Sequence, residues 1–219
     1  MTKVGVLLSG SGSNFQSIID NIKSGYIDAS ISVVISDNKD AYGLKRAQDN
    51  GIEVETVDYK SYNDRTSYDK HIVDLLNKHG AELVVLAGYM KVVTPFFVNA
   101  FKDRIMNIHP ALLPSFPGLH VQKKALDYGA KFSGCTVHFV DEGVDTGPII
   151  VQAVVPIFCD DTEESLSKRI LKEEHKIYPL AIKLYVENRL KIEDRRVIIT
   201  PRIDGKEAAI INPPVEQFR

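Results

Sequence analysis

The alternation of short strand-like segments with apolar stripes at helical spacing is the feature that most constrains how this chain folds. Strand-like segments occupy residues 3–8, 31–35, 53–57 and 83–87, and between them apolar residues recur at the three- and four-residue intervals of a helix. The last of these segments is apolar without interruption, which is typical of a central parallel strand covered on both faces. The pattern predicts right-handed βαβ units and a doubly wound α/β fold.

The second half of the chain predicts a change of strand direction. A helix is expected at 121–128, followed by two long extended segments, 132–140 and 149–156, which a loop joins. Strands connected by a short loop favour antiparallel pairing, because a parallel connection needs a longer crossover. We therefore expect a mostly parallel sheet with one antiparallel strand near the C-terminal half.

A last long helix and a polar tail follow. Asp161 or Thr162 is expected to cap this helix at its start. Pro179 predicts a kink or break in it, because proline cannot donate to the carbonyl one turn back. From Glu193 onward the tail is charged and then rich in Pro and Gly, and we expect at most a short edge hairpin at 197–211.

Composition argues against several classes of function. The chain has 219 residues, 44% hydrophobic and 26% charged, as in an ordinary globular protein. Its net charge of −2 offers no overall attraction to nucleic acid or to a membrane surface. No apolar run approaches the roughly 20 residues of a membrane span. Cys135 and Cys159 have neither metal-ligand spacing nor a disulfide framework. With no signal-peptide pattern at the start, these features predict a cytoplasmic protein.

A glycine-rich turn, residues 10–14, stands between the first strand and the first helical stripe. Free N–H groups at the start of a helix, together with the helix dipole, favour an anion there. The third glycine of the dinucleotide-binding pattern is missing, although Asp37 stands roughly where a ribose-binding acid is expected. We therefore favour a single phosphate on Gly12, Ser13 and Asn14, with a turn that binds nothing as the alternative.

Asn107 and His109 stand where a strand gives way to a stiff loop, since Pro110, Pro114 and Pro117 forbid a helix there. Open α/β sheets bind ligands at such strand ends. The two residues are two positions apart, so their side chains point to the same side. An amide donor beside an imidazole suits oxyanion stabilisation and proton movement, the needs of acyl transfer. For the motif in isolation, a half-buried His that caps a carbonyl is the simpler interpretation.

Asp145, in the loop at 141–148, is a third candidate for the same site. A carboxylate beside His109 would favour the imidazolium and hold the orientation of the ring. The sequence alone does not place Asp145 there, and Asp in a glycine-containing loop is usually a turn residue.

Seven motifs carry a resemblance to a known family. They are Gly10-Ser11-Gly12-Ser13-Asn14, Leu86-Ala87-Gly88-Tyr89-Met90, Asn107-Ile108-His109-Pro110, Leu113-Pro114 through Pro117-Gly118, Thr136-Val137-His138-Phe139-Val140, Asp145-Thr146-Gly147-Pro148, and Glu174-His175 through Tyr178-Pro179. By the order and spacing of these motifs the chain resembles the phosphoribosylglycinamide formyltransferases, the folate-dependent transformylases of purine synthesis. The resemblance runs from Val4 to about Leu190, and it implies the formyltransferase fold and a formyltransferase domain at 1–190. The tail at 191–219 follows no pattern of the family, and we expect a short hairpin there that packs on the same domain.

The resemblance implies transfer of a formyl group from 10-formyltetrahydrofolate to the amino group of glycinamide ribonucleotide. Asn107, His109 and Asp145 would form the catalytic trio. The neutral amine would attack directly, and the amide with the protonated imidazole would stabilise the oxyanion. Asp145 would sustain the charge on His109 and help to move the proton toward N10. No metal and no Ser or Cys nucleophile is needed. His138 is interpreted as a satisfied polar contact.

The resemblance also implies binding residues. Gly12, Ser13 and Asn14 would hold the phosphate, and Glu174 would contact the glycinamide substrate. The expected partners are these two small molecules, and a homodimer is compatible with the sequence, which does not fix the oligomeric state. Ala111 departs from the family, where Ser is common, so local contacts there are in doubt. The residues implied for the folate pocket are Arg65, Met90, Lys91, Val92, Val93, Asp141, Glu142, Gly143 and Val144.

Three other functions are alternatives to this one. Methionyl-tRNA formyltransferase would be expected to add a C-terminal domain and a basic surface, whereas this chain has 27 basic and 29 acidic residues. Formyltetrahydrofolate deformylase would be expected to carry an N-terminal regulatory domain, whereas the first strand begins at Lys3. A non-catalytic nucleotide-binding module would use the glycine-rich turn but leave the trio without a joint purpose.

Overall fold

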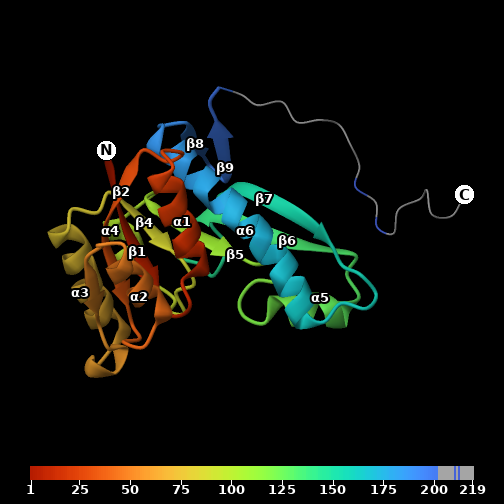
Figure 1. Cartoon of the computed structure of the whole chain (residues 1–219), viewed down its shortest axis with the longest axis horizontal. Coiled ribbons are helices and arrows are strands. Elements are labelled where there is room, and N and C mark those ends of the chain that lie inside the picture. Colours follow the sequence, from red (N-terminus) through yellow and green to blue (C-terminus); the bar gives the residue numbers. More distant parts are fainter. Residues whose placement is uncertain (202–209, 211, 213–219) are drawn as a thin grey trace, which may run out of the picture.

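The computed structural model describes residues 1–201, 210 and 212, and it shows one mixed sheet with helices on both faces (Figure 1). Within the described residues, nine strands form the sheet in the order β3-β2-β1-β4-β5-β6-β7-β9-β8. The four strands expected in the first half of the chain are confirmed as β1 to β4. The strands are β1 Thr2–Leu8, β2 Ala29–Ser36, β3 Val54–Thr56, β4 Leu83–Leu86, β5 Ile105–His109, β6 Phe132–Phe139, β7 Ile149–Pro156, β8 Leu190–Glu193 and β9 Arg196–Ile199.

Strand directions follow the predicted division of the sheet. Strands β3, β2, β1, β4 and β5 pair in parallel, which confirms the doubly wound half. Strand β6 pairs antiparallel with both β5 and β7, as expected for a reversed strand. Strand β8 is a second reversed strand, because it forms a tight antiparallel hairpin with β9 while β9 runs parallel to β7. The expectation of only one antiparallel strand is corrected in this respect.

Two hydrophobic clusters separate the faces of the sheet. Helices α1, α2, α5 and α6 contribute to the cluster on one face, and α3 and α4 contribute to the cluster on the other. In Figure 1 the long helix α6 crosses over β6 and β7. The helices are α1 Ser13–Lys23, α2 Tyr42–Asp49, α3 Arg65–Lys78, α4 Pro95–Ala100, α5 Val121–Tyr128 and α6 Glu163–Val186, with a short 3-10 helix, η1, at Tyr59–Ser61.

Helix α6 begins at a capping box and continues through a proline. Of the two candidate caps, Thr162 is the N-cap: its hydroxyl accepts from the Ser165 N–H at 3.2 Å, and its own N–H donates to the Ser165 hydroxyl at 3.0 Å. The helix does not end at Pro179, so of the two predicted alternatives the break is wrong, and the kink stays a prediction. Pro179 has no N–H to donate to the carbonyl of His175, and this carbonyl accepts instead from the Ser17 hydroxyl of α1 at 2.8 Å. This bond satisfies the orphaned acceptor and joins α1 to α6.

Strands β8 and β9 form a C-terminal hairpin. Strand β9 pairs with β7, and β8 is the edge strand of the sheet. Most of the expected hairpin at 197–211 falls on residues 202–209 and 211, which lie outside the described residues. The division into a domain at 1–190 and a tail at 191–219 stays a prediction.

The register of β5 against β6 brings polar side chains of the two strands together. Asn107 lies opposite His138, and His109 lies opposite Thr136. The neighbouring strand β4 places Leu86 beside Asn107. This part of the sheet is therefore where the carboxyl ends of β4 and β5 meet the reversed strand β6.

Among the helices of the described residues, none has the length and apolar character needed to cross a membrane.

Candidate active site

A cavity of about 630 Å³ opens at the carboxyl ends of β4 and β5. Its walls come from segments that are far apart in the chain, which meet only in the folded sheet. Asn107, His109 and Asp145, the predicted trio, all line it, as does Glu174 from α6. Among the predicted folate residues, the lining includes Met90, Lys91, Val92, Val93, Gly143 and Val144.

His109 is the last residue of β5, and it is buried at the base of this cavity. Its Nε2 lies 2.9 Å from the carbonyl oxygen of Phe116, and its Nδ1 lies 3.4 Å from Oδ2 of Asp145. Both ring nitrogens therefore face oxygen acceptors. A protonated imidazole donates from both nitrogens and satisfies both oxygens, whereas a neutral ring would leave one lone pair against an acceptor.

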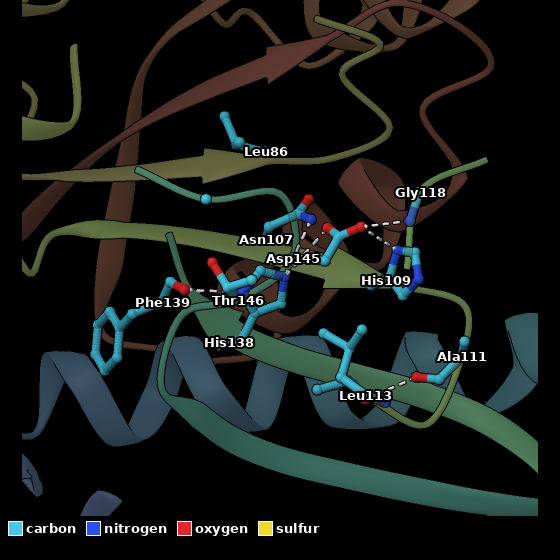
Figure 2. A network of polar contacts seen from close by, with 12 residues as sticks. Leu86, Asn107, His109, Ala111, Leu113, Gly118, His138, Phe139, Asp145 and Thr146 are labelled. Carbon is cyan, nitrogen blue, oxygen red and sulfur yellow. Dashed lines mark hydrogen bonds and ion pairs between the residues drawn. The ribbon is translucent and has the colours of Figure 1, made fainter. Parts of the chain in front are cut away.

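Asp145 reaches His109 from the loop between β6 and β7 (Figure 2). Its Oδ2 also accepts from the N–H of Gly118 at 2.9 Å, so one carboxylate oxygen joins two loops. The loop passes so close to β6 that a Cβ on Gly147 would lie 1.8 Å from the carbonyl oxygen of Phe139. Only glycine fits there, and this close approach lets the loop turn back and place Asp145 over the end of β5.

Arg195, in the turn of the C-terminal hairpin, supports the same loop. Its Nη2 donates to the carbonyl of Thr146, the residue after Asp145, at 2.7 Å. On the other side, Oδ1 of Asp141 accepts from the Thr146 hydroxyl at 2.6 Å and from the N–H of Gly143 at 3.1 Å. The backbone around Asp145 is thus held from both sides.

Asn107 and His109 point to the same side of β5, as the two-residue spacing predicts. The amide nitrogen of Asn107 lies 3.3 Å from Nε2 of His138. The other nitrogen of that ring, Nδ1, lies 2.8 Å from the carbonyl oxygen of Phe139. Figure 2 shows Asp145 between the two imidazoles, with its Oδ1 3.8 Å from Nε2 of His138. The interpretation of His138 as a satisfied polar contact is confirmed, but its partner Asn107 was not predicted, because only the register of β5 on β6 brings the two together.

Glu174 and Asn14 connect the cavity to the glycine-rich turn. Glu174 is only 6% exposed, and its Oε2 accepts from the side-chain amide of Asn14 at 2.6 Å. Burial raises the pKa of the Glu174 carboxyl, and the bond from Asn14 opposes this rise. Within the described part of the chain, Oδ1 of Asn14 is buried without a hydrogen-bond partner. Both side chains line the cavity and thus present polar groups to a bound molecule.

The glycine-rich turn leads into α1 as expected for an anion site, and α2 packs behind it. Gly12 is the N-cap residue, at a φ of 68°, with no side chain bonded across the first turn. Two carbonyls of the turn are already satisfied by α2: Gly10 accepts from the N–H of Gly43 at 3.1 Å, and Ser11 accepts from Nε of Arg46 at 2.9 Å. The first N–H groups of α1 remain without intrahelical partners.

The segment at 88–93 forms the other wall of the cavity. The N–H of Met90 donates to the Ser9 hydroxyl at 2.9 Å. At its far end, buried Asp69 accepts from both the N–H and the hydroxyl of Thr94, at 2.6 and 2.7 Å. Lys91 lies 3.4 Å from Oδ2 of Asp37, so the position of a ribose-binding acid is occupied by an ion pair. The turn is therefore not arranged like a dinucleotide site.

The remaining predicted residues lie around the cavity and do not line it. Arg65 is the exposed first residue of α3. Asp141 shapes its own loop, and Glu142 accepts from the side-chain amide of Asn99 at 3.4 Å. Gly12 lies in the turn, and Ser13 lines a smaller hollow beside α1. Their roles stay predictions. Among the described residues, no group of three or more His, Cys, Asp or Glu is placed to hold a metal ion.

Comparison with known proteins gives one family. The family model described as formyl transferase matches residues 2–182. A phosphoribosylglycinamide formyltransferase of Haemophilus influenzae is 44% identical over 206 residues, covering 94% of this chain and 95% of the relative. A trifunctional purine biosynthetic protein of Drosophila melanogaster is 48% identical over 186 residues, but the matched region is only 14% of that protein. The crystal structure of glycinamide ribonucleotide transformylase 1 from Symbiobacterium toebii is 53% identical, with a TM-score of 0.90 over 91% of this chain and 94% of that one.

Proposed function

The chain belongs to the formyl transferase family, and on that premise we propose that Asn107, His109 and Asp145 carry out the reaction. The enzyme is folate-dependent: it transfers the formyl group of 10-formyltetrahydrofolate to the amino group of glycinamide ribonucleotide, a step of purine biosynthesis. One observation carries the assignment of the trio. These three side chains come from two separate segments and meet in one cavity, with Nδ1 of His109 3.4 Å from Asp145.

The first step is attack of the neutral amine of glycinamide ribonucleotide on the formyl carbon. A carbon–nitrogen bond forms, and the formyl oxygen becomes an oxyanion. The amide of Asn107 and the protonated ring of His109 are the two donors that stabilise this charge. His109 can serve the oxyanion only by exchanging one of its two acceptors. The Phe116 carbonyl is the weaker of them, because it carries no formal charge, whereas Asp145 is an anion.

The second step moves a proton and breaks a bond. The amine, positively charged after attack, loses a proton to Asp145. The oxyanion then re-forms the carbonyl as the bond between the formyl carbon and N10 of the folate breaks, and N10 gains the proton that the amine lost. Asp145 suits this step because its Oδ2 is fixed by Gly118 and His109, while the surrounding loop is held on both sides. The net change is formyl transfer, with no covalent enzyme intermediate.

The two substrates approach from opposite sides of the trio. The glycine-rich turn, through Gly12, Ser13 and Asn14, binds the phosphate, and Glu174 contacts the rest of the ribonucleotide. The segments at 90–93 and 141–144 bind the folate, and Arg65 contacts its far end. The support is that exposed apolar side chains gather on this side: Met90, Val92 and Val144 line the cavity and remain 67%, 46% and 50% exposed. Such a patch suits a flat heteroaromatic ring.

Purified protein mixed with 10-formyltetrahydrofolate, with and without glycinamide ribonucleotide, tests the function. We expect tetrahydrofolate to form only when both substrates are present, with the formyl group recovered on the ribonucleotide. Release of formate from the folate alone at the same rate would contradict the proposal and favour a deformylase. The cytoplasmic location and a homodimer also remain proposals, and light scattering of the purified chain tests the latter.

A further inference from the structure

His138 has a definite hydrogen-bond arrangement that the reaction steps above do not use. It lies on β6 opposite Asn107 on β5, and it is 2% exposed. Its Nδ1 lies 2.8 Å from the carbonyl oxygen of Phe139, and its Nε2 lies 3.3 Å from the side-chain nitrogen of Asn107. The ring also lines the cavity. A buried imidazole with both nitrogens engaged cannot rotate without losing bonds.

The partners of the ring fix its tautomer. A carbonyl oxygen only accepts, so Nδ1 must carry the hydrogen that faces Phe139. In the neutral ring Nε2 then holds a lone pair and accepts from Asn107. This acceptor distinguishes the two ends of the Asn107 amide, because only its NH₂ end can bond to a lone pair. The ring thus selects one of the two orientations of the amide.

The surroundings of His138 favour the neutral ring. Burial lowers its pKa, against the opposing effects of the Phe139 carbonyl and the Asp145 carboxylate. The charged groups facing it from neighbouring elements are Asp145 and Asp141 in the loop, which favour protonation, and His109 on β5, which opposes it. A protonated His109 beside Asp145 therefore helps to keep the second imidazole neutral.

We propose that His138 is a positioning residue that holds the NH₂ end of the Asn107 amide toward the oxyanion by accepting one of its two hydrogens. The second hydrogen of that nitrogen is then free for the formyl oxygen. Without the acceptor the amide can turn over, which would present its own oxygen to the developing negative charge. The inference rests on the proposed role of Asn107 and deepens it.

A double-mutant cycle separates positioning from a merely structural contact. In the wild-type background His138→Leu removes the acceptor, and we expect kcat to fall about 10- to 100-fold with the KM of both substrates little changed. In an Asn107→Ala background the same change should cost less than about twofold, because no amide remains to be oriented. His138→Gln, which keeps an acceptor oxygen, should recover part of the rate. His79→Leu, a remote histidine paired with Glu55 at 3.3 Å, serves as the control.

The outcomes distinguish this inference from the proposed function. Equal losses from His138→Leu in both backgrounds would overturn the positioning role while leaving the trio intact. Full activity of Asn107→Ala alone would overturn both. His138 is 2% exposed, so its replacement also tests core packing, and nitrogen NMR of the unmodified protein is an independent measurement. We expect the Nδ1–H tautomer of His138 at neutral pH, and an Nε2–H tautomer or a cationic ring would contradict the inference.

Discussion

At the scale of single residues, the site is defined by which atoms can donate. His109 faces two oxygens, and His138 faces one oxygen and one amide nitrogen. His109 is therefore placed to donate from both ring nitrogens, whereas Nε2 of His138 is placed to accept from Asn107. We propose that this difference lets Asp145 pair with one ring while the other ring orients Asn107.

Asp145→Asn tests the need for that negative charge. The amide has the size of the carboxylate, but it cannot sustain a protonated His109 or accept a proton from the amine. We expect kcat to fall by about 10²- to 10⁴-fold, the usual range for loss of a general acid–base group, with substrate KM changed much less. Steady-state kinetics with both substrates measures this. Asp127→Asn, a surface carboxylate paired with Lys123, should have no effect, and a similar loss there would point to a general charge effect.

Asn107, His109 and Asp145 are predicted from the sequence as site residues, whereas His138 is predicted there only as a satisfied polar contact with no named partner, and the reason is physical. Three prolines after His109 show where the strand ends, and the two-residue spacing of Asn107 and His109 places their side chains on the same side of the strand. Both signals lie within a short segment of the sequence. The partner of Asn107 depends on the register of β5 against β6, which lies 31 residues away in the chain. A one-residue slip would have placed His138 on the opposite face.

At the scale of elements, α2 supports the glycine-rich turn from behind. Its Arg46 donates to the Ser11 carbonyl at 2.9 Å and to the Gln16 side chain at 3.1 Å. These bonds occupy a carbonyl that would otherwise repel an anion, and they bring a positive charge close to it. The turn therefore depends on a helix that supplies no residue of the glycine motif.

Arg46→Met should weaken binding of the phosphorylated substrate. We expect the KM for glycinamide ribonucleotide to rise about 10-fold or more, since a charge-assisted hydrogen bond contributes about 1.5–3 kcal/mol, while kcat at saturation changes little. The matched control is Lys45→Met on the same helix, whose ammonium pairs with Asp49 and does not touch the turn. Equal effects of the two substitutions, or equal effects on a substrate lacking phosphate, would argue against the role of Arg46.

An ion pair at the start of α6 is expected to stabilise the protein. Arg169 binds both carboxylate oxygens of Asp161, at 2.6 and 2.8 Å, and this pairing holds the pKa of Asp161 well below its usual range. A depressed pKa in the folded state adds stability above the unfolded carboxyl pKa of about 3.9, and this stability is lost as pH falls below that value. We expect Asp161→Asn to destabilise the protein by about 1–2 kcal/mol at pH 7.

Denaturant unfolding of both proteins at several pH values measures this difference. The gap between the wild type and Asp161→Asn should be constant from pH 7 down to about 5 and should shrink below about pH 4. A gap that does not change across this range would show that the ion pair contributes nothing through the charge of Asp161. Asp160→Asn, the exposed neighbouring acid, is the control.

Helix α6 also shows where local rules are overridden by packing. Proline in the chain predicts a break, because the ring removes a donor and crowds the preceding turn. In the fold the lost partner of the His175 carbonyl is replaced by the Ser17 hydroxyl from α1. The sequence contains both residues, but they lie 158 positions apart, and only the packing of α1 on α6 brings them together.

At the scale of the whole molecule, the C-terminal hairpin is bonded to the loop at 141–148, which contains Asp145. Among the described residues, the cavity lining includes no side chain of the hairpin β8–β9. The hairpin instead supports the backbone next to Asp145, because Arg195 donates to the Thr146 carbonyl. This long-range contact has no local signal in the sequence, whereas the parallel half of the sheet was predictable from local apolar runs.

Arg195→Ala should loosen the loop that carries Asp145. The bond is exposed, so we expect little change in global stability and a decrease in kcat of about 2- to 10-fold, the effect of one hydrogen bond of about 0.5–1.5 kcal/mol. Amide hydrogen exchange over 141–148 should become faster. Arg196→Ala, the next residue, is the control, since no side-chain bond of Arg196 to this loop is seen among the described residues. If kcat and the amide hydrogen exchange over 141–148 are both unchanged in Arg195→Ala, the hairpin does not support the loop that contains Asp145.

The central claim is that three converging side chains catalyse direct formyl transfer. It is tested by the single-turnover rate of formyl transfer from bound 10-formyltetrahydrofolate to glycinamide ribonucleotide, measured for the wild type and for His109→Ala. We predict a rate at least 100-fold lower in the variant, about 2.7 kcal/mol of lost transition-state stabilisation, with the folate bound as tightly as before. A variant that transfers the formyl group at close to the wild-type rate would contradict the claim.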